Sequence, residues 1–189
     1  MQVLVGSITA EFRRYKSLAE GALAQVSEAQ LAAPGPAGGN SLATICWHVA
    51  GNLQSRFSDF RTADGEKPWR KREEEFLARD VSRVELLAKW NAGWDVLFAA
   101  LAALNDGELT ATVTIRQQPL AVHEALHRSL AHVSYHVGQL VYLAHAHCGA
   151  AWRYLSIPPG QSDAYNSNPR YDQPDAQAQA IADATGTPG

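Results

Sequence analysis

The chain has 189 residues, of which 46% are hydrophobic and 19% charged, so its length and composition are those of one globular domain and exclude a disordered chain. The formal net charge of −3 gives no concentrated positive surface for nucleic acid, and the longest apolar run, Val96 to Leu104, is far shorter than the roughly 20 residues of a membrane span. Two cysteines cannot form a disulfide scaffold, and the N-terminus shows no signal peptide. We therefore expect a reduced, cytoplasmic chain that binds neither nucleic acid nor membrane.

Hydrophobic residues at three- and four-residue spacing predict the first two helices. The first helix runs from about Val3 to Val26, and a capping box at residues 27–30 predicts one extra turn after it. A Pro- and Gly-rich segment over residues 34–39 breaks the helical pattern. The second helix begins at Asn40 or Ser41 and continues to about Ala63, and the charged run from Glu66 to Glu75 is expected to be a surface loop.

Capping signals also mark the second half of the chain. Ser82 opens a capping box and begins the third helix, which extends to about Leu104. Alternating β-branched residues over 110–115 predict a short strand or an extended segment. Pro119 is expected in the first turn of the fourth helix, which runs to about His147.

Four long helices joined by broken connections predict an all-α fold, an antiparallel four-helix bundle with long crossing loops. We assign the bundle domain to residues 1–165. Prolines concentrate after residue 150, so residues 166–189 are expected to form an irregular C-terminal tail, in which residues 177–184 could form one or two weak helical turns.

Polar residues on the fourth helix share one face. A helix turns by about 100° per residue, so His132 and His136 lie about 40° apart and Gln139 lies about 20° from His132. Two imidazoles at this spacing can bind one metal ion, although a pair of hydrogen-bonded core histidines has the same periodicity. His123 and His127 are also four residues apart but lie roughly 140–180° around the helix, so we expect them at the periphery of the bundle.

A third histidine lies on the second helix. His48 and Asn52 follow a polar line that borders the apolar stripe of this helix. If the polar borders of the two helices meet, His48 joins His132 and His136 in a three-nitrogen site. Such a site suits one divalent ion of zinc, nickel or iron, which would lower the pKa of a bound water or thiol.

Two motifs carry a family resemblance. The segments SLATICWHVAGN (residues 41–52) and AHVSYHVGQ (residues 131–139) resemble the DinB-like (YfiT-like, damage-inducible) superfamily of bacterial metal-binding four-helix bundles. The segments DGEKPWRKR (64–72) and LSIPPGQS (155–162) resemble an uncharacterised branch of it, and the likeness extends from the first helix to about residue 162. The resemblance implies one metal ion held by three residues: His48, His132 and His136.

The resemblance also implies a class of activity. Several members of the superfamily are, or are proposed to be, transferases or isomerases that use bacillithiol, mycothiol or glutathione, and homodimers are common. We therefore expect a metal-dependent enzyme, a homodimer, that activates a low-molecular-weight thiol for transfer to a small electrophilic substrate. A non-catalytic metal-binding stress-response module, a metal-dependent hydrolase and a metal-free dimer with core histidines remain open alternatives. The histidine face of the fourth helix has no carboxylate, which weakens the hydrolase and leaves the catalytic residues unassigned.

Other polar residues lie near the expected ligands. Three are candidates for contact with the ligands or the substrate: Asn52, Tyr135 and Gln139. A surface amide and a packing aromatic are the alternative interpretations of the first two. Arg70 and Arg72 would receive an anionic substrate if their loop folded over the site, and a solvated loop is the alternative.

Overall fold

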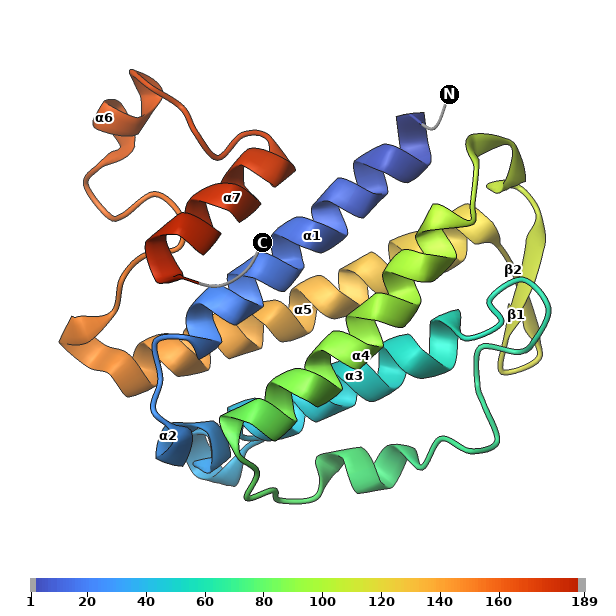
Figure 1. Cartoon of the computed structure of the whole chain (residues 1–189), viewed down its shortest axis with the longest axis horizontal. Coiled ribbons are helices and arrows are strands. Elements are labelled where there is room, and N and C mark those ends of the chain that lie inside the picture. The colour runs from blue at the N-terminus through green and yellow to red at the C-terminus, as the bar shows by residue number, and fades with distance from the viewer. Residues whose placement is uncertain (1–2, 187–189) are drawn as a thin grey trace.

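The computed structural model of the chain describes residues 3–186. Four long helices form a bundle (Figure 1): α1 (Val3–Leu23), α3 (Leu42–Phe57), α4 (Arg83–Ala102) and α5 (Val122–Cys148). Helices α1 and α5 run in one direction, and α3 and α4 run in the opposite direction. The predicted all-α bundle with antiparallel helix packing is therefore confirmed.

The predicted helix starts are confirmed where a serine caps them. The Ser41 and Ser82 side chains accept hydrogen bonds from the backbone N–H groups of the third helical residue of α3 and of α4. The capping box at Ser27 begins α2 (Glu28–Ala32), and a 3-10 turn, η1 (Pro36–Gly38), follows it. Helix α3 ends at Phe57 rather than near residue 63, because Ser58 is extended and Asp59 adopts a left-handed conformation with φ of 48°.

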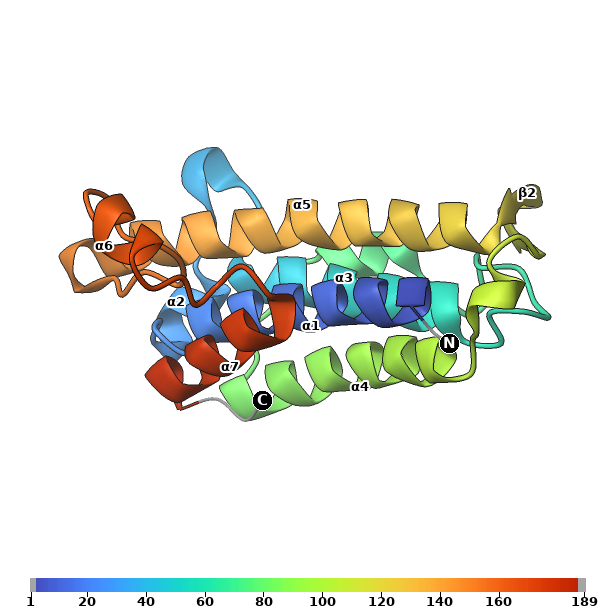
Figure 2. The same ribbon diagram turned by 90° about the horizontal axis from the view of Figure 1, so that it is seen from above.

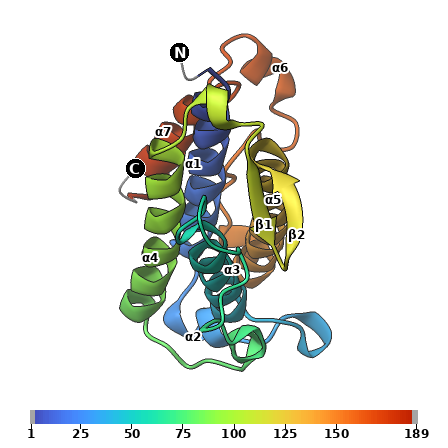
Figure 3. The ribbon, with the colours of Figure 1, turned by 90° about the vertical axis from the view of Figure 1, so that its right-hand side faces the viewer.

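A β-hairpin precedes α5. A 3-10 turn, η3 (Asp106–Glu108), leads into the antiparallel strands β1 (Thr112–Ile115) and β2 (Gln118–Ala121), and Figure 3 shows the hairpin beside α5. The extended segment predicted over 110–115 is confirmed, but the prediction of Pro119 in the first helical turn is wrong. Pro119 lies in β2 because residues 116–117 have φ values of 55° and 61°, which suit a two-residue hairpin turn.

The connection from α3 to α4 crosses the length of the bundle. Because these two helices run in the same direction, residues 58–82 must return along α3 before α4 begins (Figure 1). Ser55 attaches this crossover to α3, since its hydroxyl donates to the Gly65 carbonyl (2.7 Å) and accepts from the Lys67 N–H (3.3 Å). The 3-10 helix η2 (Arg72–Phe76) lies within it. The surface loop expected at 66–75 is wrong in part, because Lys67 and Glu75 are buried.

The C-terminal segment contains three further helical elements: η4 (Gly149–Ala151), α6 (Ser162–Asn166) and α7 (Pro174–Thr185). Helix α7 lies beside α1 (Figures 1 and 2) and buries Ile181, which contacts the α1 backbone at Gly21. The tail was expected to be irregular apart from one or two weak helical turns at residues 177–184, but residues 174–185 form a helix because Ile181 packs against α1. Pro174 occupies the helix N-terminus, where proline is tolerated. Residues 187–189 of that tail lie outside the described residues.

The core lies between the four long helices. Phe12, Trp90 and Trp94 are its largest fully buried aromatic side chains. Helix α3 is buried on most of its surface because α4, α5 and the crossover all cover it. A side chain on α3 can therefore be polar only where neighbouring groups satisfy it. Within residues 3–186, no helix combines the length and apolar character that crossing a bilayer requires.

Candidate metal centre

Three histidines from two helices meet in the bundle. His48 comes from the middle of α3, and His132 and His136 come from successive turns of α5. The Nε2 atoms of His48 and His132 are 3.2 Å apart, and one ring nitrogen from each of the three residues lies within 4.8 Å of the others. Two nitrogens bound to one tetrahedral zinc ion at about 2.0–2.1 Å would be about 3.3 Å apart, so the spacing of His48 and His132 fits one ion.

A buried carboxylate orients His48. Glu75 in η2 accepts a hydrogen bond at Oε2 from His48 Nδ1 (2.9 Å), and Arg70 donates two hydrogen bonds of 2.8 Å to the same carboxylate. Burial raises the pKa of Glu75, but Arg70 and His48 lower it by more, so the pKa is below its ordinary value and the group is ionised. An ionised carboxylate can only accept, so Nδ1 of His48 carries the proton and Nε2 presents a lone pair to the cluster.

The neighbouring glutamine has the same effect on His136. The side-chain oxygen of Gln139 accepts a hydrogen bond from His136 Nδ1 at 2.8 Å. The unprotonated nitrogen of His136 is then Nε2, which is free to face the other two rings. The hydrogen bonds to Glu75 and Gln139 therefore leave Nε2 of His48 and of His136 unprotonated, as a metal site requires.

The electrostatic environment keeps the α5 histidines neutral. Burial, followed by the neighbouring His136 and His48, lowers the pKa of His132 to about 3. Burial and His48 also lower the pKa of His136, although Gln139 opposes this shift. Both imidazoles are uncharged at neutral pH, which is the form that binds a metal ion.

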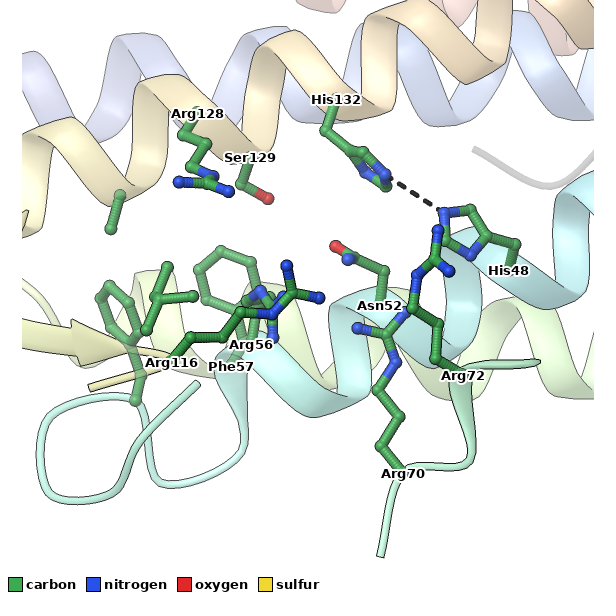
Figure 4. Close-up of a pocket in the computed structure, with 13 residues that line it drawn as sticks. His48, Asn52, Arg56, Phe57, Arg70, Arg72, Arg116, Arg128, Ser129 and His132 are labelled. Carbon is green, nitrogen blue, oxygen red and sulfur yellow. Dashed lines mark hydrogen bonds between the residues drawn. The ribbon is translucent and has the colours of Figure 1, made fainter. Parts of the chain in front are cut away.

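A cavity of about 180 Å³ adjoins the cluster. His48, Asn52 and His132 line it together with arginines from α3, the crossover, the hairpin and α5, and Figure 4 shows the crossover arginines beside His48 and Asn52. No aspartate or glutamate of residues 3–186 is among its lining residues. The cavity can therefore admit a small molecule beside the histidines without placing a carboxylate base next to it.

The other residues that the sequence suggested for contact with ligands or substrate differ in whether they line the cavity. Asn52 is buried and lines the cavity, whereas Tyr135 is 65% exposed, with its ring centroid 5.1 Å from that of His136. Both Arg70 and Arg72 line the cavity, so the crossover does fold over the site. As expected, His123 and His127 are exposed at the periphery, away from the three-histidine cluster.

Sequence reasoning missed the residue that orients His48. Glu75 is 27 residues from His48 in a run of mixed charges, and no periodicity connects the two. It also missed Arg128 and Ser129, which precede His132 on α5 and line the cavity with it. Their positions three and four residues before His132 are the signal that could have placed them near the same face.

The amino-acid sequence matches the model of one known protein family. The model described as "Protein of unknown function (DUF1572)" matches residues 2–161. The chain belongs to this family. The match includes the three histidines, the crossover and the hairpin, and it ends before α6. No curated protein and no solved structure matches the chain.

Proposed function

We propose that this DUF1572 chain binds one divalent metal ion through His48, His132 and His136 and is a metal-dependent enzyme. The observation that carries the proposal is the convergence of three ring nitrogens from α3 and α5, with the outer nitrogens of His48 and His136 engaged by Glu75 and Gln139. Outer contacts of this kind are typical of histidine ligands in metal sites. They support the superfamily resemblance of the two histidine motifs.

The number of ligands favours catalysis over a structural role. In the part of the chain that the structure describes, the cluster of His, Cys, Asp and Glu side chains that could hold an ion contains three residues. A structural zinc site has four protein ligands, whereas a catalytic site has three and leaves a position for substrate. The adjoining cavity gives a small molecule access to that position.

The cavity favours a thiol over water as the nucleophile. An ion bound by the three histidines would supply Lewis acidity that favours the thiolate form of a bound thiol. Hydrolysis needs a group that manages the protons of water, and no described carboxylate lines the cavity. Glu75 cannot take this role because Arg70 and His48 already engage its carboxylate.

We therefore propose transfer of a low-molecular-weight thiol to a small electrophile. The thiol proton goes to solvent, the thiolate sulfur bonds to the electrophilic carbon, and the leaving group departs with its electron pair. His48 and His132 line the cavity, so a nucleophile bound there lies beside the metal ligands, and Asn52 lies where its amide can contact it or the electrophile. We also propose that the chain is located in the cytoplasm and forms a homodimer.

Metal analysis tests the first part of the proposal. We expect the purified chain, or the chain supplied with zinc, nickel or iron, to hold close to one ion per chain. His132→Ala should lose most of this metal, whereas His123→Ala, an exposed histidine on the same helix, should retain it. Equal metal contents in the two variants would contradict the assignment of the ligands.

Thiol transfer is tested on the metal-loaded chain. Incubation with glutathione, bacillithiol or mycothiol and a chloronitrobenzene should release chloride faster than the thiol alone, and His132→Ala should abolish the difference. If metal binds but no thiol reacts faster than in buffer, the non-catalytic metal-binding module replaces the enzyme.

A further inference from the structure

The cavity beside the histidines is strongly basic. Five arginines line it, from four separate parts of the fold: Arg56, Arg70, Arg72, Arg116 and Arg128. Their ion pairs involve three carboxylates, those of Glu66, Glu73 and Glu75. Five guanidinium groups against three carboxylates leave a net positive charge around the cavity, although the whole chain has a net charge of −3.

One of these arginines has no carboxylate partner, and another shares its partner with a second arginine. Arg128 on α5 makes no ion pair with any residue of the described range 3–186, and Figure 4 shows its guanidinium directed toward the space between α5 and α3. Arg116 lies at the hairpin turn, where its backbone N–H donates to Asp64 (2.8 Å), and it shares the single carboxylate of Glu66 with Arg56. The turn therefore holds Arg116 at the mouth of the cavity.

Buried polar atoms without partners occur on the same lining residues. Among the described residues, no hydrogen-bond partner is found for Arg70 Nη1, Ser129 Oγ or His132 Nδ1. The Arg70 side chain is 2% exposed, and Glu66, its nearest further carboxylate, is 4.0 Å from Nη1. Leaving a buried donor unpaired is costly, so Arg70 Nη1 and the Ser129 hydroxyl indicate a ligand that accepts hydrogen bonds.

We propose that this cavity is an oxyanion subsite that binds the carboxylate or phosphate group of a small-molecule substrate. Arg128 and Arg116 contribute charge, and Ser129 and Arg70 donate hydrogen bonds to the anion oxygens. Planar guanidinium groups match carboxylate and phosphate oxygens in pairs, which is why arginines dominate such sites. The subsite deepens the proposed function, because an anion held there directs the rest of the molecule toward the histidine cluster.

The test measures anion binding directly. Inorganic phosphate and malonate are titrated into the purified chain by isothermal titration calorimetry at constant ionic strength, and the metal content of each sample is determined. We expect saturable binding of at least one of the two anions, and the tighter one identifies a phosphate or a carboxylate subsite. Arg128→Gln should weaken this binding by about tenfold or more, as loss of a charge-assisted hydrogen bond predicts, with its metal content unchanged.

A matched control separates a local effect from net charge. Arg13→Gln removes an exposed arginine from α1, outside the cavity, and should bind the anion as the wild type does. The proposal is overturned if neither anion binds, or if Arg128→Gln and Arg116→Gln both bind like the wild type. Anion binding by a chain that holds no metal would support the subsite and refute the metal proposal. Failure of the anion subsite can therefore be distinguished from failure of the metal site.

Discussion

Replacing Glu75 with glutamine tests whether the crossover orients the metal ligand. Glutamine keeps the size of the side chain but replaces the charged carboxylate, whose oxygens accept hydrogen bonds from His48 Nδ1 (2.9 Å) and from Arg70 (2.8 Å). Arg70 can only donate, so the single amide oxygen of the glutamine faces Arg70 and its NH2 group faces His48 Nδ1, which must then accept and leave the proton on Nε2. A protonated Nε2 has no lone pair for a metal ion, so the variant should bind metal more weakly.

The expected magnitude follows from these contacts. Loss of an outer hydrogen-bond partner typically weakens metal affinity by about 10- to 100-fold, which corresponds to about 1.4–2.7 kcal/mol. The change also leaves the Arg70 guanidinium, 2% exposed, without its ionised partner. Breaking a buried ion pair costs about 3–5 kcal/mol of folding free energy, so Glu75→Gln should also lower the melting temperature.

The assay is competition for zinc against a chromophoric chelator, at a temperature where circular dichroism shows the variant to be folded. Glu74→Gln is the matched control, because Glu74 is adjacent in sequence but exposed, with only a 3.2 Å ion pair to Lys71. The control should keep the wild-type affinity. A Glu75→Gln affinity within twofold of the wild type would refute the reasoning that the crossover sets the tautomer of His48.

Two further predictions concern pH and helix packing. For the metal-free chain, the pKa of His132 is about 3 in the folded state against an ordinary 6.5, so the unfolded chain binds more protons between these values, and the free energy of unfolding should fall as pH drops below about 6.5. Urea unfolding at pH 7.5 and 5 measures this fall, and an equal fall in His132→Gln would contradict it. Gly93→Ala should destabilise the bundle by about 1–3 kcal/mol in thermal unfolding, because its Cβ would lie 2.7 Å from Ala50 Cα in α3. Gly138→Ala meets no atom within 4 Å and should be stabilising by about 0.5–1 kcal/mol, so a similar loss in both variants would argue against the close approach of α3 and α4.

Local signals in the sequence were sufficient for the helices and for the histidine face of α5. The caps at Ser41 and Ser82 depend on backbone groups three residues away, and the alignment of His132, His136 and Gln139 depends on the pitch of one helix. These interactions are between near neighbours in the chain. They could be predicted without knowledge of which helix packs against which.

Where local signals competed, two predictions from the sequence were wrong. Pro119 suits a helical first turn, but pairing with β1 across the turn at residues 116–117 places it in a strand. The prolines after residue 150 predicted an irregular tail, yet α7 forms because it buries Ile181 against α1. In the first case pairing with the adjacent strand, and in the second case contact with the distant helix α1, outweighed the local preference.

The sequence by itself thus determined an all-α chain and the alignment of two histidines on one helix, since helix periodicity and capping act within a few residues. The tertiary structure decided that His48 meets them, that Glu75 is buried beside it, and that five arginines surround one cavity. The physical reason is the direction of the helices. Because α3 and α4 run the same way, the chain must cross back over α3, and that path carries Arg70 and Glu75 to residues that no local pattern connects with them.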